Sequence, residues 1–525
     1  MTAIDPVPAP SAEDAPRPRA VLVVDSDYSI GPVDRRLFGS FVEHLGRCVY
    51  DGIHEPTHPS ADADGFRQDV LELVRELGVT TVRYPGGNFV SGYRWEDGVG
   101  PRESRPRRLD LAWHSTETNQ VGLHEFAGWL ESTGAELMLA VNLGTRGLEE
   151  ALDLVEYANV RGGTALSQQR IDNGRTEPFD VRMWCLGNEM DGPWQLGHRT
   201  ADEYGALAVK VARGIRQLDP RVELVVCGSS NAQMPTFGTW ERTVLEHTYD
   251  EVDYISCHVY YEEKDGDLAS FLASGAAMDS FIEEIVATID SVKAARRSDR
   301  RIDISFDEWN VWYNTRFENE ERITDIEHWP VAPRLLEDSY SVADAVVVGG
   351  MLLSLLKHAD RVTAASLAQL VNVIAPIMTE PGGPAWRQTT FFPFAAASRL
   401  ARGSALRPHL LSPSHATAEH GTVPSVDAVA VLDREASTLA VFAVNRHTTE
   451  TIDLELDLRT LLVQPETAEA WLLHDDDPSA RNTLDDRERV APTRLEVRLD
   501  AFGRGTVTLP PVSWATISLR VEFVG

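Results

Sequence analysis

The strongest constraint on the fold is a repeated alternation of short apolar runs with amphipathic helical segments. Eight runs are typical of buried strands: residues 38–44, 79–85, 136–143, 181–188, 223–229, 252–259, 302–307 and 362–369. Between strands, apolar side chains recur at spacings of three and four, the period of an amphipathic helix, in residues 66–77, 123–130 and 204–218. Eight strands with intervening helices predict a (β/α)8 TIM barrel, enlarged by loop insertions, over residues 36–398.

An open, doubly wound sheet would produce a similar alternation and is the alternative fold at this stage. The first strand is not followed by a Gly-rich phosphate loop. Its lack counts against the dinucleotide-binding form of that fold.

The pattern changes after about residue 400, where short strand-like runs are separated by turn residues. Examples are residues 428–432, 439–444 and 506–509, and helical periodicity is nearly absent. We therefore predict a second domain, an antiparallel β-sandwich, over residues 399–525. An apolar run also opens residues 21–35, ahead of the barrel, and we expect this strand to pair into the sandwich. Residues 1–20, rich in Pro, Ala and acidic side chains, are expected to be disordered.

The bulk composition argues against several classes of partner. A formal net charge of -32 argues against nucleic acid and anionic membrane surfaces, because both need a basic patch. No apolar run approaches the roughly 18 residues of a membrane span. The N-terminus shows no basic region followed by an apolar one, so no signal peptide is visible. We expect a cytoplasmic protein.

The cysteines and histidines give no indication of a metal centre. Cysteine occurs at four positions without CxxC spacing: Cys48, Cys185, Cys227 and Cys257. Three of these lie in strand-like runs, which suits small buried side chains. The sequence has no dense His/Cys cluster, nucleotide motif or Ser-His-Asp nucleophile elbow. We predict that the protein uses no metal and no other cofactor.

Two glutamates at strand ends point to the chemistry. Asn188 and Glu189 end the fourth strand candidate, and Glu308 ends the seventh. The carboxyl ends of barrel strands converge at one mouth, where active sites lie. A pair of carboxylates there is the minimal equipment for glycoside hydrolysis. A single acid after a strand is also common as a helix cap or in a solvated loop, so the pair carries the inference.

Several sequence blocks resemble the α-L-arabinofuranosidases of glycoside hydrolase family 51. They are VRYPGGNF at 82–89, GNEMDGPWQ at 187–195, DEWNVWY at 307–313 and QLVNVIAPI at 369–377. Their order and spacing agree from about residue 38 to 395, and so does the trailing β domain. The resemblance implies a retaining, exo-acting enzyme that releases terminal α-L-arabinofuranosyl residues from arabinan- or arabinoxylan-derived oligosaccharides. It also implies a homo-oligomer and suggests a hexamer.

The same resemblance assigns roles to individual residues. It implies that Glu189 is the acid/base and Glu308 the nucleophile. It further implies that the hydroxyls of the sugar are contacted by Glu43, Asn88, Asn188 and Gln369.

Other residues near the strand ends are candidates with a structural alternative. Arg83 could hold the nucleophile by a forked hydrogen bond, or form a structural ion pair. Tyr260 could donate a hydrogen bond to Glu308, and His258 lies beside it at the same strand end. Both could instead be ordinary polar core residues.

Two tryptophans and one long segment complete the candidate site. Trp113 and Trp312 could line the sugar pocket or the leaving-group side, although aromatic residues are more often core. Residues 315–340 form a long charged loop at the catalytic mouth, which is either part of the substrate wall or a solvated insertion.

Three rival functions stay open from the sequence. An endo-acting glycanase or a β-xylosidase could use the same barrel, and a sugar-binding protein could have lost catalysis. The presence of both glutamates counts against the last. The sequence does not choose among 1,2, 1,3 and 1,5 linkages.

Overall fold

Eight parallel strands close into a barrel in the order β10-β11-β12-β3-β4-β7-β8-β9. The computed structural model describes residues 17–461, 463–500 and 503–523. The barrel strands are β3 (Gly39–Phe41), β4 (Thr81–Tyr84), β7 (Glu136–Val141), β8 (Met183–Leu186), β9 (Glu223–Val226), β10 (Tyr254–Tyr261), β11 (Asp303–Val311) and β12 (Val362–Ala368). Each overlaps one of the eight apolar runs, so the (β/α)8 prediction is confirmed and the doubly wound alternative is wrong.

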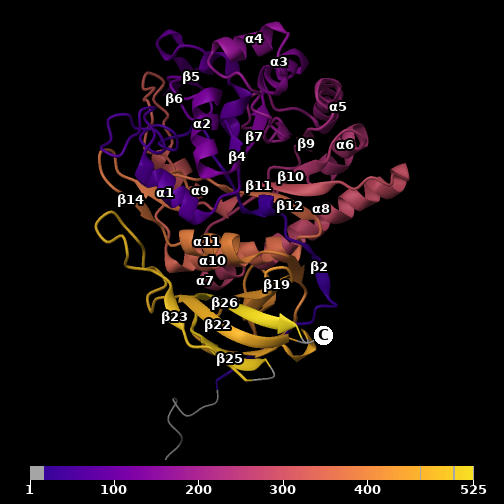
Figure 1. Cartoon of the computed structure of the whole chain (residues 1–525), viewed down its shortest axis with the longest axis vertical. Helices are drawn as coiled ribbons and strands as arrows, with labels where there is room; N and C mark the ends of the chain where they lie inside the picture. The colour runs from indigo at the N-terminus through magenta and orange to yellow at the C-terminus, as the bar shows by residue number, and fades with distance from the viewer. Residues whose placement is uncertain (1–16, 462, 501–502, 524–525) are drawn as a thin grey trace, which may run out of the picture.

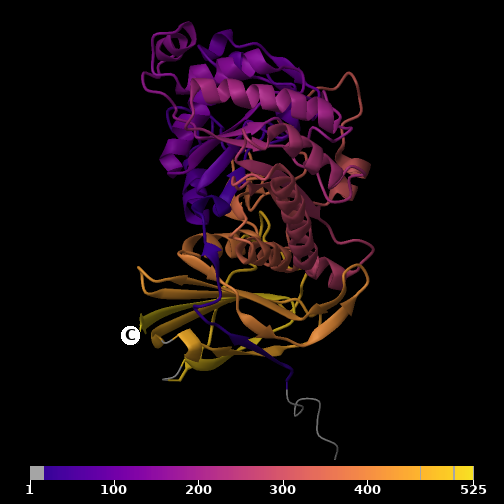
Figure 2. The same cartoon turned by 90° about the vertical axis from the view of Figure 1, so that its right-hand side faces the viewer.

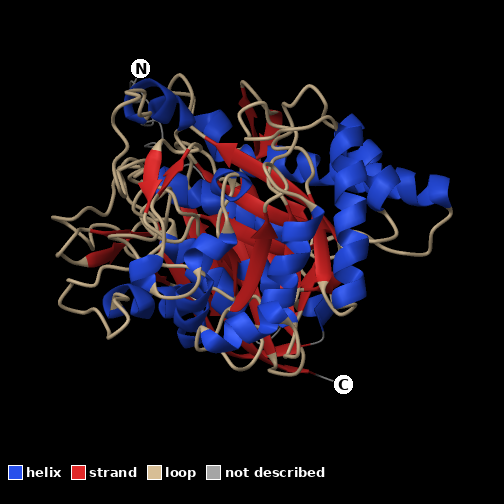
Figure 3. Ribbon diagram, turned by 90° about the horizontal axis from the view of Figure 1, so that it is seen from above, coloured by secondary structure: helices blue, strands red, loops and turns tan. Residues whose placement is uncertain are grey.

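Helices surround the barrel (Figure 1), and the view from above shows them as a blue layer around the red strands (Figure 3). They are α1 (Gln68–Leu77), α2 (Leu123–Thr133), α3 (Leu148–Asn159), α4 (Ala165–Asp172), α5 (Ala201–Leu218), α6 (Thr239–Thr248), α7 (Leu268–Leu272), α8 (Ser274–Arg296), α9 (Asn314–Arg316), α10 (Val342–Lys357) and α11 (Phe391–Leu400). Helix α5 shows why the sequence folds this way. Thr200 caps its first turn and Glu203 closes the capping box. The apolar side chains of its inner face are buried against the barrel.

Strand β11 differs from the expected segment, because it continues to Val311 rather than ending before Glu308. Its pairing with β10 advances from Ser305 to Glu308 while β10 advances only from Ser256 to His258. The pairing with β12 slips at the same place. One extra residue in β11 is therefore accommodated as a bulge, a device that re-aims side chains beside active sites.

The C-terminal domain is a sandwich of two sheets, drawn in orange and yellow below the barrel in Figure 2. The five-stranded sheet contains β16 (His409–Leu411), β1 (Arg19–Val23), β21 (Ile452–Asp457), β25 (Arg504–Leu509) and β24 (Arg498–Leu499). The seven-stranded sheet contains β2 (Ser29–Pro32), β15 (Ser404–Leu406), β19 (Val426–Asp433), β20 (Thr438–Asn445), β26 (Ser513–Phe523), β22 (Val463–Leu473) and β23 (Thr493–Leu495).

Three two-stranded sheets lie outside these layers. They are formed by β5 (Arg108–Asp110) with β6 (Ser115–Glu117), β13 (Ile377–Thr379) with β14 (Ala385–Arg387), and β17 (Ser414–Thr417) with β18 (Gly421–Pro424). The first and the last of these hairpins contribute to the cavity described below.

The N-terminal strand β1 lies in the sandwich, between β16 and β21. It runs parallel to β21, so the sandwich is not antiparallel throughout. A short hairpin would force β1 to run antiparallel to its neighbour. No such hairpin joins β1 to β16 or β21, so the strand can pair in either direction. Arg19 and Ala20, expected in a disordered segment, begin this strand, because the buried Ala20 pairs with Leu454. Pro18, just before the strand, accepts a hydrogen bond from the backbone of Asp453, and residues 1–16 lie outside the described residues.

Helix α10 joins the two domains. All its residues except Lys357 are buried, because the helix packs between the barrel helices α8 and α11 and the sandwich strands β19, β20 and β26. A Cβ placed on Gly349 would lie 2.4 Å from the ring of Trp514, on β26. A glycine is therefore needed where the helix meets the sheet. Among the described residues, no helix combines the length and apolarity needed to span a membrane.

Candidate active site

A cavity of about 820 Å³ opens at the carboxyl ends of the barrel strands. Eight of the eleven site residues expected from the sequence line it: Glu43, Asn88, Trp113, Glu189, Tyr260, Glu308, Trp312 and Gln369. The other three, Arg83, Asn188 and His258, lie behind them and contact their side chains. The strand ends thus bring all eleven candidates into one region.

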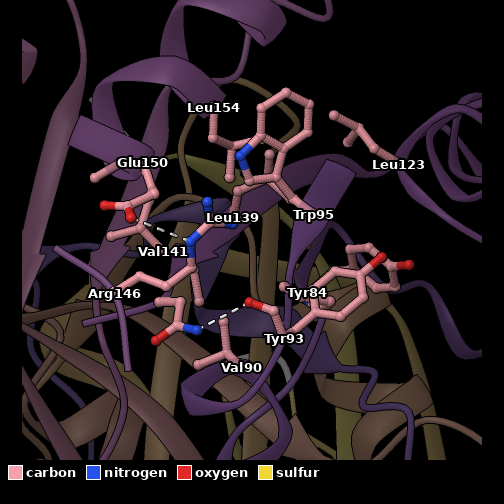
Figure 4. Close-up of a pocket in the computed structure, with 14 residues that line it drawn as sticks. Tyr84, Val90, Tyr93, Trp95, Leu123, Leu139, Val141, Arg146, Glu150 and Leu154 are labelled. Atoms are coloured by element: carbon pink, nitrogen blue, oxygen red, sulfur yellow. Dashed lines mark hydrogen bonds and ion pairs between the residues drawn. The ribbon is translucent and has the colours of Figure 1, made fainter. Parts of the chain in front are cut away.

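A second cavity lies between the barrel and its covering segments, beside Tyr84, Trp95 and Leu139 (Figure 4). Its volume of about 30 Å³ is enough for water but not for a sugar ring. Its lining is mostly apolar, and its polar groups pair with one another: Asn142 donates to the carbonyl of Tyr93, and Arg146 pairs with Glu150. We regard it as a packing gap and place the site in the larger cavity.

Glu308 lies in the β11 bulge and is held by two fixed donors. Arg83 on β4 donates from Nη1 to Oε1 at 2.8 Å, and the Tyr260 hydroxyl donates to Oε2 at 2.7 Å. Burial raises the pKa of this carboxyl, but His258 and Arg83, with the hydrogen bond from Tyr260, outweigh it. The net pKa lies below the ordinary value of a glutamate, which favours the ionised form.

Glu189 follows β8 after a sharp change of direction. Gly187 has φ 91° and Glu189 itself has φ 43°, a left-handed conformation that is rare outside glycine and concentrated at functional sites. Its Oε2 accepts a hydrogen bond from Nε1 of Trp194 at 2.8 Å, and its Oε1 lies 3.0 Å from Nδ1 of His258. Burial and the negative charge of Glu308 raise the pKa of Glu189. The two carboxyls therefore differ in the direction that an acid and a nucleophile require.

The two glutamates are close together. One oxygen of Glu189, one oxygen of Glu308 and one nitrogen of His258 all lie within 4.8 Å of one another. The pKa of His258 is raised because the two carboxylates outweigh its burial. Within the described residues these three could also hold a metal ion, so the expectation of a metal-free enzyme stays a prediction.

Glu43 is the centre of a second polar group in the cavity wall. Its carboxylate accepts hydrogen bonds from the backbone of Phe89 at 2.8 Å, from Nε1 of Trp113 at 3.0 Å and from Nε2 of Gln369 at 3.2 Å. Burial raises the pKa of Glu43 to about 8. The group therefore presents a carboxyl, an indole and an amide to the cavity, which suits hydroxyl recognition.

Three predicted substrate-binding residues do not line the cavity: two contact a catalytic-site glutamate, and Asn188 contacts Arg83 and Asn88. Arg83 divides its guanidinium, because Nη1 donates to Glu308 and Nη2 donates to Asn188 at 2.6 Å. Only one terminal nitrogen of Arg83 therefore donates to Glu308, and the forked hydrogen bond to this carboxylate is not formed. Asn188 in turn donates to Asn88 at 3.4 Å, and His258 contacts Glu189. These residues orient the carboxylates and one cavity-lining amide.

The loop over residues 315–340 forms part of the cavity wall. Phe317, Arg322 and Ile323 line the cavity, so the solvated-insertion alternative is wrong for this part of the loop. Phe317 contacts the rings of Trp113 and Trp312 at centroid distances of 5.9 and 6.2 Å. The loop and the two tryptophans thus close the cavity together.

Trp194 is a residue that the sequence reasoning did not assign. Its side chain is 51% exposed, yet its indole nitrogen contacts Glu189. Its place in the Gly192-Pro193-Trp194 turn, directly after the Asn-Glu pair, is a signal that could have identified it.

Models of two known domains match the chain. The α-L-arabinofuranosidase 1 domain matches residues 73–274, and the α-L-arabinofuranosidase C-terminal domain matches residues 307–513. An exo-α-(1→6)-L-arabinofuranosidase of Bifidobacterium longum is 61% identical over 95% of this chain and 97% of its own. The chain belongs to the α-L-arabinofuranosidases. The family that we inferred from the sequence blocks is confirmed, and the protein is a glycosidase.

Two further relatives support the assignment. An intracellular exo-α-(1→5)-L-arabinofuranosidase of Streptomyces lividans is 60% identical over 95% of this chain and 75% of its own. The solved structure of a family 51 α-L-arabinofuranosidase from Bifidobacterium longum superposes with a TM-score of 0.91, at 51% identity, covering 96% of this chain and 99% of that one. The barrel and the sandwich of this arabinofuranosidase are therefore those of family 51.

Proposed function

We propose that this arabinofuranosidase releases terminal α-L-arabinofuranosyl residues from the non-reducing ends of oligosaccharides, with Glu308 as nucleophile and Glu189 as acid/base. The observation that carries the proposal is the proximity of their carboxyl oxygens, within 4.8 Å. Retaining glycosidases have carboxyls about 5–5.5 Å apart, whereas inverting enzymes need roughly 6.5–9.5 Å to admit a water molecule. The spacing supports direct attack by Glu308.

The first step forms a covalent intermediate. The Glu308 carboxylate attacks the anomeric carbon while Glu189 gives its proton to the departing glycosidic oxygen. The carbon–oxygen bond to the leaving group breaks and an ester bond to Glu308 forms. Arg83 and Tyr260 keep the nucleophile ionised and fixed in place through their hydrogen bonds.

The second step releases the sugar. Glu189, now ionised, takes a proton from water, and the resulting hydroxyl attacks the anomeric carbon. The ester bond breaks, Glu308 is regenerated and Glu189 is protonated again. Two inversions give arabinose with retained configuration.

The substrate-binding roles of Glu43, Asn88, Gln369, Trp113 and Trp312 belong to the same proposal. All five line the same cavity as Glu308, and their carboxyl, amide and indole groups suit the hydroxyls and ring faces of a furanose. We assign Asn188, Arg83 and His258 to positioning the carboxylates and Asn88.

The names of the relatives bear on which linkage the natural substrate contains. Two enzymes of nearly equal identity are named for different linkages, 1→6 and 1→5. We propose short arabinose-containing oligosaccharides as substrates in the cytoplasm, supported by the intracellular relatives. Comparing arabinose release from α-1,5- and α-1,6-linked substrates decides the linkage. A homo-oligomer, with a hexamer as the form suggested by the family, stays a prediction that sedimentation analysis would test.

The direct test uses p-nitrophenyl α-L-arabinofuranoside. The wild-type enzyme should release nitrophenol and arabinose, and Glu308→Ala should lose roughly three orders of magnitude or more in rate. Glu320→Ala is a matched control, because this glutamate is exposed on the mouth loop. A wild-type preference for p-nitrophenyl β-D-xyloside, or a Glu308→Ala variant that retains more than a few per cent of the rate, would overturn the proposal.

A further inference from the structure

The cavity extends well beyond the space of one sugar ring. Its volume of about 820 Å³ falls in the range of roughly 300–1,000 Å³ of pockets that hold ligands several times larger than a pentose. The group around Glu43 closes one part of it. The remainder runs past Glu189 and Trp194, along the loops that follow β9 and β10. Glu189 is the group that protonates the leaving oxygen, so this remainder lies on the leaving-group side.

The far end of the cavity is supplied by the other domain. The turn between β17 and β18 carries Glu419 and His420, and both line the same cavity as the catalytic pair. In Figure 2 an orange hairpin at the right of the sandwich rises toward the barrel. The sandwich therefore contributes side chains to a site whose chemistry belongs to the barrel.

This turn is held in place by the first turn of α7. The backbone N–H of Glu419 donates to Oγ of Ser270 at 3.1 Å. Ser270 in turn donates to Asp267 from its backbone at 3.1 Å and from its hydroxyl at 2.5 Å. These hydrogen bonds lower the pKa of Asp267, and the nearby His420 adds to the effect. The turn is thus fixed against helix α7 of the barrel domain.

Polar side chains along this part of the wall are free to bind a ligand. Within the described part of the chain, the side chains of Glu419, His420 and Lys264 make no hydrogen bond or ion pair. Asn231 uses only its Oδ1, which accepts from the backbone of Gln233, so its Nδ2 donors are unused. Uncommitted donors and acceptors along a cleft are suited to sugar hydroxyls, and their mixed charges favour a neutral ligand.

We propose that the turn at residues 418–420 of the sandwich, together with Asn231 and Lys264, forms a subsite for the leaving-group part of the substrate. The ligand is an uncharged oligosaccharide of at least two sugar units attached to the terminal arabinofuranose. The inference rests on the proposed function and names the substrate class that it favours. It makes the sandwich domain a determinant of substrate length.

The test compares a long with a short leaving group in the double variant Glu419→Ala/His420→Ala. Its kcat/KM on α-1,5-linked arabinotriose should fall about fivefold to thirtyfold, the effect expected from the loss of one or two hydrogen bonds. Its kcat/KM on p-nitrophenyl α-L-arabinofuranoside should change less than twofold, because the nitrophenyl group does not reach the turn. Thr422→Ala is the matched control, since Thr422 is exposed on the same hairpin and does not line the cavity.

Two results would overturn the inference. Wild-type kcat/KM values of the double variant on both substrates would show that the turn does not contact the substrate. An equal loss on both substrates would show that the turn acts only on the stability of the barrel loops. Wild-type inactivity on both substrates would be a different failure, because it would overturn the proposed function and this inference with it.

Discussion

Individual side chains give two similar carboxyls different surroundings. Glu189 and Glu308 are both largely buried, with 11% and 8% of their side chains exposed, so burial alone does not separate them. Glu308 receives hydrogen bonds from a cation and a hydroxyl, whereas Glu189 faces the negative charge of Glu308. The neighbours therefore lower the pKa of Glu308 and, with burial, leave the pKa of Glu189 raised.

Tyr260→Phe should raise the pKa of Glu308 by removing a hydrogen bond to its charged form. Ionised Glu308 is needed for attack, so the acidic limb of the kcat/KM profile should move to higher pH. We expect kcat to fall about tenfold to a hundredfold at the optimum. Tyr261→Phe is the matched control, because this neighbouring tyrosine lines the cavity without contacting either glutamate. An acidic limb that stays in place would refute the role of Tyr260.

The identities of the two glutamates could be predicted from the sequence, because each lies in a recognisable block at a strand end. The hydrogen bonds by which Arg83 contacts both Glu308 and Asn188 could not be predicted from the sequence. These three residues come from three different strands or their ends, and their distances depend on the barrel register.

Secondary-structure elements set the shape of the cavity. The β5–β6 hairpin carries Trp113, whose backbone N–H, with that of Ala112, donates to Asp110. The 315–340 loop lies against this hairpin: Trp329 stacks on His114 with a centroid distance of 3.7 Å. Two segments that are far apart in sequence thus form one wall.

Trp329→Ala should loosen this wall, because the stacked contact with His114 is lost. We expect KM for the aryl arabinofuranoside to rise about threefold to tenfold, while kcat changes little, since neither catalytic glutamate is touched. Ile326→Ala is the control, because its side chain is 76% exposed in the same loop. A fall in kcat without a change in KM would contradict the proposed role of the loop.

The elements themselves were well predicted, because apolar runs of strand length and helical spacing are local signals. The C-terminal end of β11, at Val311, could not be predicted in the same way. Its bulge at Glu308 arises from the pairing with both β10 and β12, and a single sequence does not carry that register.

At the scale of the whole molecule, the two domains share one packed interface. Helix α10 belongs to the barrel, yet its Gly349 lies against Trp514 of the sandwich. The presence of a trailing β domain could be predicted from the change in pattern after residue 400. The parallel pairing of β1 with β21 could not be predicted, because it joins segments from opposite ends of the chain.

Gly349→Ala should destabilise the protein by about 1–3 kcal/mol, because the added methyl group clashes with the Trp514 ring. Gly350→Ala is a matched control in the same helix, since its Cβ would meet no atom within 4 Å. That control should be neutral or stabilising by up to about 1 kcal/mol, because alanine favours a helix over glycine. Thermal unfolding of the two variants measures the difference, and equal stabilities would contradict the described packing.

The central claim, a double displacement with distinct roles for the two glutamates, is tested most directly by azide rescue of Glu189→Ala. With an activated aryl arabinofuranoside the variant should still form the ester on Glu308, because a good leaving group needs little protonation. Azide should then restore turnover, and proton NMR should identify the product as the α-configured arabinofuranosyl azide, with retained configuration. A β-configured azide, or no rescue at all, would contradict the account.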